Sequence, residues 1–300
     1  MKKYIYTLLF AASIVLGACS EDKLDSHSIF DTESPERNAF DTWLLLNYVV
    51  PYNIQFNYKY IDKESDNTYN LIPAEYDKCV AMAKLTKYLW IDSYNELLGE
   101  TFIKTYCPRM IQLIGSKASK SQGSVVLGTA EGGLKITLYN VNELNANSPD
   151  IDFLNTWFFK TMHHEFAHIL HQKKSYPTEY NQISAADYSS TGWQNRTELQ
   201  AWKLGFVTPY AGMQPQEDFV EVIANYLVKP DGFWENMLAN AGTEGAAKIQ
   251  TKFDMAKEWL MASWSIDIEE LRTIIIRRSE NIDSILNEKM TDNESVSYTH

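Results

Sequence analysis

Four of the six histidines in this chain lie close together, between positions 163 and 171. Two of them, His164 and His168, are four residues apart, a spacing that puts both imidazoles on one face of an α-helix. There they can share one zinc ion (Zn2+) at about 2.0 to 2.1 Å from nitrogen to metal. The neighbouring Glu165 can then accept a proton from a water molecule that the zinc acidifies. The run therefore matches the H-E-x-x-H pattern, with Glu165 as the catalytic base.

The other two histidines of the run are less suited to the same ion. His171 shares the face of His164, but it lies about 10 Å further along the helix axis at 1.5 Å per residue. Three roles are open for His171: it lies on the substrate side, it contacts a metal-binding residue without binding the metal itself, or it is solvated. His163 points away from this face, and we expect a partly buried histidine that is bonded to the backbone.

A catalytic zinc site needs a third protein ligand and an open position for water. The continuation after His168, Ile-Leu-His-Gln-Lys-Lys, lacks the glycine and third histidine of metzincins. The candidates are the acids that open a later predicted helix, Glu217, Asp218 and Glu221. Glu217 and Glu221 share one helix face, so that one could bind the metal and the other could orient an imidazole. Their spacing leaves the roles open, and an acid-rich first turn also complements the helix dipole without any metal.

The histidine run lies in a long predicted helix, 152–172, with Asp150 or Asp152 as its N-cap. Hydrophobic periodicity predicts helices and short strands before it and mostly helices after it. The earlier elements are a helix and a strand within 43–60, helices at 74–98 and 101–114 separated near Gly99, and strands at 124–127 and 134–139 joined by a turn at 128–133. The later elements are helices near 197–203, 215–228, 232–241, 244–263 and 268–279. The sequence therefore predicts an α+β fold, with a small mixed sheet packed on the histidine helix and a mainly helical C-terminal part.

The first 18 residues have the composition of a secretory signal peptide. Two lysines precede an apolar stretch, 4–15, that is too short to span a bilayer comfortably. The stretch closes with Leu16-Gly17-Ala18-Cys19, which resembles the bacterial lipobox, whose cysteine is acylated. We expect Cys19 to be the lipidated mature N-terminus, with each buried methylene contributing about 0.8 kcal/mol to membrane binding. An ordinary cleaved signal with an incidental Cys19 is the alternative.

The remainder of the chain is predicted to contain a tether, one folded domain and a tail. Residues 19–38 are polar and form the tether from the lipid anchor. A single domain spans 39–286, with an α+β part at 39–174 and a helical part at 175–286. Residues 287–300 are predicted to be a flexible tail.

The composition is that of a globular protein with an acidic surface. The chain has 45% hydrophobic and 13% aromatic residues, enough for a substantial core. Its formal net charge of -12 repels phosphate backbones, so we expect no nucleic-acid partner. Cys79 and Cys107 are expected to be buried free thiols, with a disulfide between them as the alternative.

The candidate site resembles that of the gluzincins, zinc peptidases with H-E-x-x-H on one helix and a glutamate ligand on a later one. The tract from Tyr210 to Glu221 is similar to the Tyr, then Glu-x-Phe-x-Glu arrangement of anthrax lethal factor and its relatives. This resemblance covers about residues 160–222. It implies that Glu217 is the third ligand and that Glu221 is a carboxylate that contacts a ligand without binding the metal. It also implies that Tyr210 is the hydrogen-bond donor that stabilises the oxyanion.

A broader resemblance covers most of the chain. The lipobox, the histidine run, the tract 128–133 and the tract 217–221 together resemble the substrate import-associated zinc metallohydrolase lipoproteins, also described as zinc-binding metallopeptidases. This resemblance implies a zincin-like fold, a peptide or protein substrate, and an outer membrane location with the cell surface as the expected side. It also implies an association with a TonB-dependent nutrient importer. In gluzincins a strand at the rim of the cleft pairs with the substrate, which implies that role for 134–139.

Two other functions fit the same residues. A non-catalytic surface lipoprotein could bind substrate for a TonB-dependent importer, with zinc in a structural role or none at all. A hydrolase could also cleave a non-peptide amide or ester. A structural zinc is usually closed by four protein ligands, whereas a hydrolase leaves a position for water.

Overall fold

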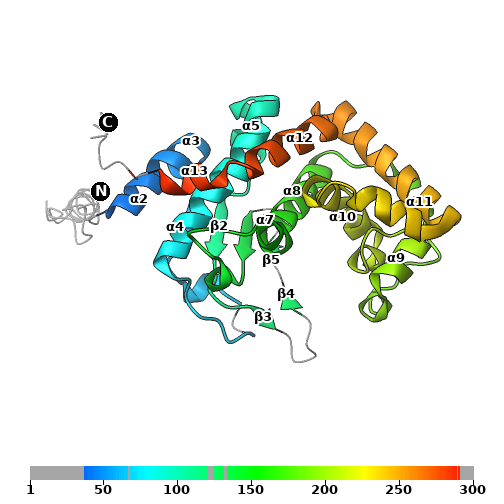
Figure 1. Ribbon diagram of the computed structural model, residues 1–300, viewed down its shortest axis with the longest axis horizontal. Coiled ribbons are helices and arrows are strands. Elements are labelled where there is room, and N and C mark those ends of the chain that lie inside the picture. Colours follow the sequence, from blue (N-terminus) through cyan, green and yellow to red (C-terminus); the bar gives the residue numbers. More distant parts are fainter. Residues whose placement is uncertain are drawn as a thin grey trace, which may run out of the picture. The chain divides into compact units, whose positions relative to one another are not determined.

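The helix that carries the histidine run begins at a predicted N-cap, Asp150, in the computed structural model of the chain (Figure 1). The Asp150 carboxylate accepts a hydrogen bond from the Asp152 amide at 2.9 Å, which satisfies a donor that the first turn leaves free. The helix continues through α7 (Ile151–Leu154), a π-helical turn (Asn155–Phe159) and α8 (Lys160–Lys173). The sequence predicted one uniform helix, and the π-helical turn is a difference from that prediction.

The structure describes residues 37–66, 68–119, 125–126, 128–131, 134–288 and 290. The predicted signal peptide, the lipidated Cys19, nearly all of the predicted tether and the tail beyond position 290 lie outside these residues. From Asn38 onward the described residues belong to one compact unit. One main hydrophobic core includes buried side chains from Phe40 to Ile282. No helix in this part of the chain is long and apolar enough to cross a membrane.

Short strands form a mixed sheet upstream of α7. In the part of the chain that the structure describes, its order is β1 (Gln55–Asn57), β2 (Met110–Leu113), β6 (Lys135–Leu138) and β5 (Gly128–Glu131). The first three strands are parallel, with Ile111 opposite Phe56 on one side and Ile136 on the other, and β5 is antiparallel to β6. A separate antiparallel pair consists of β3 (Ala118–Ser119) and β4 (Val125–Val126). This sheet confirms the predicted mixture of helices with a small mixed sheet.

The position of β6 contradicts the role implied for residues 134–139. β6 pairs with β2 on one side and β5 on the other, so its backbone groups are already used and it cannot be a rim strand. Among the described residues the outer strand on this side is β5, which also contacts α8. The predicted turn at 128–133 is wrong for residues 128–131, which pair with β6, and residues 132–133 lie outside the described part of the chain. β5 and β6 are neighbours in the sequence, with Glu131 opposite Lys135 and Gly128 opposite Leu138, so backbone pairing between adjacent segments extends the sheet into the run predicted as a turn.

The predicted helix at 101–114 is also partly wrong. Helix α6 (Glu100–Tyr106) ends at Cys107, whose backbone is extended with ψ of 154°. Pro108 follows, and proline both lacks an amide donor and disfavours the helical conformation of the residue before it. The chain therefore leaves the helix at this point and enters the sheet as β2.

The N-terminal helices flank the sheet and agree with most of the predicted pattern. They are α2 (Ala39–Leu44), a π-helical turn (Leu45–Val49) and α3 (Val50–Tyr52), then α4 (Tyr76–Leu85), a second π-helical turn (Thr86–Ile91) and α5 (Asp92–Leu98). Asn38 and Asp41 form a capping box at the start of α2. Gly99, at φ of 78°, separates α5 from α6 as predicted, because glycine adopts this left-handed backbone without a steric cost.

The part after α8 is nearly all helical, as predicted. It contains α9 (Glu198–Leu204), α10 (Pro215–Val228), α11 (Phe233–Trp264), α12 (Ile268–Ser279) and α13 (Ile282–Asn287), with short 3-10 turns at Thr178–Gln182, Gly192–Asn195 and Tyr210–Met213. α11 bends at Gly242, where the sequence predicted two helices. The sequence did not predict α13. α8 and α10 lie side by side, and α9 packs on α11 (Figure 1).

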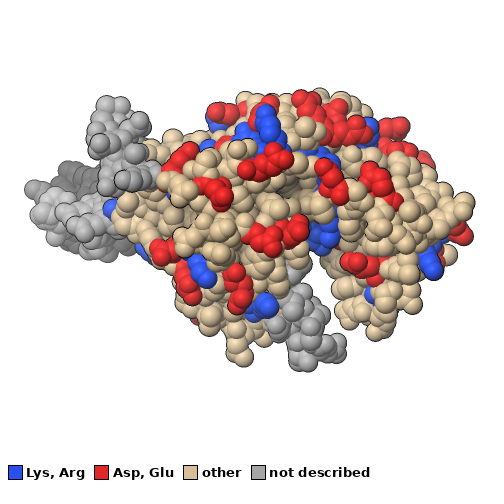
Figure 2. Space-filling view, in the orientation of Figure 1, with Lys and Arg blue, Asp and Glu red and all other residues tan. Residues whose placement is uncertain are grey.

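The acidic surface is spread over several elements. Figure 2 shows groups of Asp and Glu side chains over much of the visible face, with Lys and Arg beside several of them. Some of these charges connect distant parts of the chain. Arg277 and Arg278 of α12 both pair with Glu96 of α5, so the C-terminal helices are attached to the first half of the domain.

The cysteines Cys79 and Cys107 are buried free thiols, as predicted. Each Sγ atom lies 3.7 Å from a backbone carbonyl oxygen, that of Tyr58 or of Tyr52. Burial raises the pKa of Cys79 to about 12 and that of Cys107 to about 11. Both thiols therefore stay protonated and unreactive at neutral pH.

Candidate metal centre

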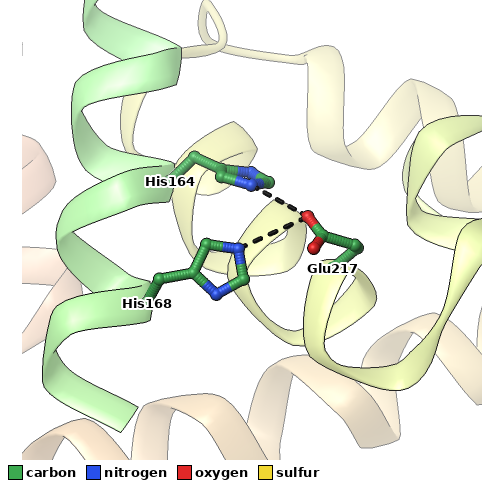
Figure 3. A group of neighbouring side chains, drawn as sticks. All are labelled: His164, His168 and Glu217. Atoms are coloured by element: carbon green, nitrogen blue, oxygen red, sulfur yellow. Dashed lines mark hydrogen bonds and ion pairs between the residues drawn. The ribbon is translucent and has the colours of Figure 1, made fainter. Parts of the chain in front are cut away.

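Two helices bring the candidate ligands together. α8 presents His164 and His168 on one face, because residues four apart lie one above the other. α10 begins at Pro215, whose ring suits a first helical turn, and Glu217 lies in that turn. Since α8 packs directly against α10, the side chain of Glu217 reaches the imidazoles across the interface between the helices (Figure 3).

The three side chains converge on one point. Glu217 Oε2 lies 3.1 Å from His164 Nε2 and 3.3 Å from His168 Nε2, as the dashed lines in Figure 3 show. One donor atom from each residue lies within 4.8 Å of the other two. Two imidazole nitrogens and one carboxylate oxygen are the donor set of many catalytic zinc sites. The residues therefore fit a zinc ion, and three protein ligands leave a coordination position for water.

The surroundings of His164 favour a cation at this point. Burial disfavours the imidazolium, but hydrogen bonds to Glu217 and Glu221 outweigh it and raise the pKa of His164 to about 9. Burial also opposes the charged form of Glu217, yet its bonds to His164 and His168 hold its pKa far below the usual value. The carboxylates around the imidazoles thus create a negative potential that attracts a metal cation.

Glu221 lies behind His164 and orients it. His164 Nδ1 lies 2.9 Å from Glu221 Oε1, so an imidazole that bound a metal through Nε2 would donate its Nδ1–H to this carboxylate. Glu221 is only 1% exposed. Its Oε2 accepts hydrogen bonds from Thr208 at 2.6 Å and Asn225 at 3.2 Å, and Lys160 Nζ lies 3.4 Å from Oε1. Burial opposes ionisation, but Lys160 and His164 hold the pKa of Glu221 far below its usual range, so it remains an anionic acceptor.

Asp218, the other acid considered from the sequence, does not join this group. It is fully buried, and its Oδ2 lies 2.6 Å from Lys252 Nζ and accepts a hydrogen bond from the Tyr188 hydroxyl at 2.7 Å. Lys252 also donates to the Gly205 carbonyl at 2.7 Å. The pair ties α10 to α11 and to the chain after α9. Sequence reasoning missed Lys252, although its helical spacing from the apolar residues Ile249 and Ala256 was a signal that it lies on a buried face.

Tyr210 lies beside the candidate ligands. Its ring centroid is 5.9 Å from that of His164 and 5.0 Å from that of Trp193, which packs edge-on. Burial and then the charge of Glu217 raise the pKa of Tyr210, so its hydroxyl remains a proton donor at neutral pH. The turn that carries Tyr210 is anchored by Thr208, whose hydroxyl accepts from the Ala211 amide at 3.1 Å.

Thr208 and Trp193 are two residues near the centre that sequence reasoning did not single out. Thr208 is the same residue that donates to Glu221, so one hydroxyl connects the Tyr210 turn to the carboxylate behind His164. The only signal for Trp193 was the high aromatic content of its loop. Neither contact follows from helical or strand spacing, because Thr208 precedes Glu221 by 13 residues and Trp193 lies in a separate turn from Tyr210.

Glu165 is partly buried on α8, next to His164. Burial raises the pKa of its carboxyl group, and the nearby His164 and His168 oppose that rise. A carboxylate with a raised pKa is a stronger proton acceptor than an exposed one, which suits a general base.

The remaining histidines of the run have different surroundings. His171 Nε2 lies 2.8 Å from His168 Nδ1. Of the three roles left open for His171, the structure therefore agrees with contact to a candidate metal-binding residue. Burial, followed by the charge of His168, lowers the pKa of His171 to about 4. His163 is buried, but its Nδ1 is bonded to the Tyr94 hydroxyl at 3.0 Å rather than to the backbone as expected. It lies apart from the candidate ligands.

Comparison with known proteins identifies the family. Residues 33–269 match the family described as "Putative zinc-binding metallo-peptidase". A crystal structure from Bacteroides caccae ATCC 43185, described in the same words, shares 47% sequence identity with a TM-score of 0.73, and the match covers 88% of this chain and 98% of that one. No curated protein matches this chain. The predicted zinc cofactor is thereby confirmed at the level of the family, and the chain belongs to this family of zinc-binding metallopeptidases.

Proposed function

We propose that this protein is a zinc-dependent peptidase in which His164, His168 and Glu217 bind the metal. The observation that carries the proposal is that three donor atoms, two from α8 and one from α10, lie within 4.8 Å of one another where the two helices meet. The family description supports zinc as the metal and a peptide or protein as the substrate.

The proposed chemistry is hydrolysis of a peptide bond. A bound zinc ion supplies a Lewis acid that lowers the pKa of water to about 7 and polarises a carbonyl group. Glu165 accepts the proton of the attacking water and transfers it to the leaving nitrogen. The Tyr210 hydroxyl donates a hydrogen bond to the oxygen that becomes negative in the transition state. Glu221 keeps the proton on His164 Nδ1, so that Nε2 remains available as a ligand.

We further propose that β5 is the strand that pairs with an extended substrate. Among the described residues β5 lies at the end of the sheet and contacts α8. Backbone pairing along such an edge provides affinity without regard to sequence, and side chains near the cleft then provide selection. Trp193 stands next to Tyr210 and is suited to such a selective role.

The decisive experiment is digestion of a broad peptide library by the purified mature protein, with the products identified by mass spectrometry. We expect one bound zinc per chain, and cleavage that a chelator abolishes and added zinc restores. Glu217→Gln should lose both zinc and cleavage. Stoichiometric zinc without cleavage of any peptide would favour the alternative, a lipoprotein that binds substrate for an importer. Cleavage of an acyl amide or ester but no peptide would favour the non-peptide hydrolase.

We also propose that the protein is a lipoprotein of the outer membrane, exposed at the cell surface and associated with a TonB-dependent importer. Support comes from the lipobox-like tract Leu16 to Cys19, and from the acidic residues Glu21 and Asp22 after it, which resemble the signal that sends some Gram-negative lipoproteins to the cell surface. The protein labelled with a radioactive fatty acid in cells should fractionate with the outer membrane, and Cys19→Ser should lose the label and become soluble. A Cys19→Ser protein that keeps its label would exclude Cys19 as the acylated residue.

A further inference from the structure

His168, the second proposed ligand, is hydrogen-bonded to another histidine. Its Nδ1 lies 2.8 Å from Nε2 of His171, three residues further along α8. An imidazole that binds a metal through Nε2 must carry its proton on Nδ1. This proton can then be donated only if Nε2 of His171 has a free lone pair. The contact therefore requires a neutral His171 with its own proton on Nδ1.

We propose that His171 is a positioning residue of the metal centre, which accepts the Nδ1–H of His168 and so fixes the tautomer and ring orientation of that ligand. The inference rests on the proposed function, since it takes His168 as a ligand. It goes further by assigning a role to a residue that the H-E-x-x-H pattern does not include.

The position of His171 is set by packing rather than by the metal. Its ring meets the ring of Tyr176 edge-on at 5.6 Å and that of Phe219 at 6.4 Å. Tyr176 and Phe219 are themselves stacked, with centroids 4.2 Å apart and planes 12° from parallel. Phe219 is fully buried and lies on α10, two residues after Glu217. The acceptor for His168 is thus held by the same helix that carries the third proposed ligand.

The two proposed histidine ligands consequently donate their Nδ1–H groups to acceptors of different charge. His164 donates to the carboxylate of Glu221. That carboxylate also accepts hydrogen bonds from Thr208 and Asn225 and forms an ion pair with Lys160. His168 donates to a neutral imidazole. Charge-assisted hydrogen bonds are roughly twice as strong as neutral ones. We therefore expect the loss of the His171 acceptor to weaken zinc binding less than the loss of the Glu221 charge.

The test compares His171→Phe, which keeps an aromatic ring but has no acceptor, with His171→Gln, whose carbonyl oxygen can accept the same proton. Zinc affinity of the mature protein is measured by competition with a chromophoric chelator. We expect His171→Phe to bind zinc about 10-fold more weakly, His171→Gln to recover most of that loss, and Glu221→Gln to lose up to about 100-fold. Zinc affinity equal to wild type in His171→Phe would overturn the proposal.

Two further measurements keep the result interpretable. Thermal unfolding of the metal-free proteins shows whether His171→Phe changes the fold itself. If it does, long-range 1H–15N spectra of the zinc-loaded wild-type protein decide the question. They should show an unprotonated Nε2 on His171, and a proton on that atom would contradict the proposal. A wild-type protein that binds no zinc would instead sink the proposed function, so the two failures are distinguishable.

Discussion

Glu165→Gln is expected to lower kcat for peptide cleavage by about 10² to 10⁴-fold, the usual contribution of a general base. The amide has nearly the shape of the carboxyl group but cannot accept the proton of the attacking water. Zinc content should not change, because the converging donor atoms belong to His164, His168 and Glu217. The measurements are initial rates on a peptide found in the library digest, together with zinc analysis of the same preparation.

A matched substitution separates loss of the base from loss of a negative charge. Glu198 is exposed in the first turn of α9, and Glu198→Gln removes one charge without a change near the centre. We expect its kcat to stay close to wild type. If Glu165→Gln turned over peptide as fast as Glu198→Gln, Glu165 would have no part in the mechanism.

Lys252→Met is expected to lower the free energy of unfolding by about 3 to 5 kcal/mol, the usual cost of breaking a buried ion pair. Lys252 and Asp218 are both fully buried and lie 2.6 Å apart. Without the ammonium group, the Asp218 carboxylate stays in the interior without a neighbouring positive charge, although it still accepts the hydrogen bond of the Tyr188 hydroxyl. Urea unfolding of the metal-free protein measures this loss without a contribution from zinc binding.

Two comparisons test whether burial is the reason. The double variant Asp218→Leu with Lys252→Met removes both charges and should regain much of the stability, because apolar side chains can replace a buried pair at little cost. Some loss should remain, since the Tyr188 hydroxyl is left without its acceptor. Lys257→Met breaks an exposed pair with Glu269 and should cost much less, because solvent screens the attraction between exposed charges. Equal losses at Lys252 and Lys257 would contradict the role assigned to burial.

The secondary structure was predictable wherever local signals agreed. Asp150 caps the histidine helix and Gly99 ends α5, because a cap and a left-handed residue depend only on their neighbours in the chain. The helix predicted at 101–114 failed although a local signal was present: Pro108 marked the break, and the apolar spacing after it also fits a buried strand. The turn predicted at 128–133 was wrong for residues 128–131, because the backbone of this segment pairs with the adjacent strand β6 whatever its side chains are.

The position of the candidate third ligand depended on tertiary structure. Glu217, Asp218 and Glu221 occur within five residues, and successive helical residues point about 100° apart at 3.6 residues per turn. Their directions are therefore known, but their partners are not. Packing of α10 against α8 directs Glu217 to both imidazoles and Glu221 to the back of His164. Asp218 turns toward α11, where Lys252 meets it.

By itself the sequence determined that two imidazoles share one helical face with Glu165 beside them, because the period of the α-helix alone sets that arrangement. It also limited the third ligand to a few acids on one later helix. Only the tertiary structure decided which acid faces the imidazoles, which of the described strands ends the sheet beside α8, and that the ring of His171 packs near Phe219 of α10. The physical reason is distance along the chain: the contact between His168 and Glu217 joins residues 49 positions apart, and its geometry depends on how whole helices pack.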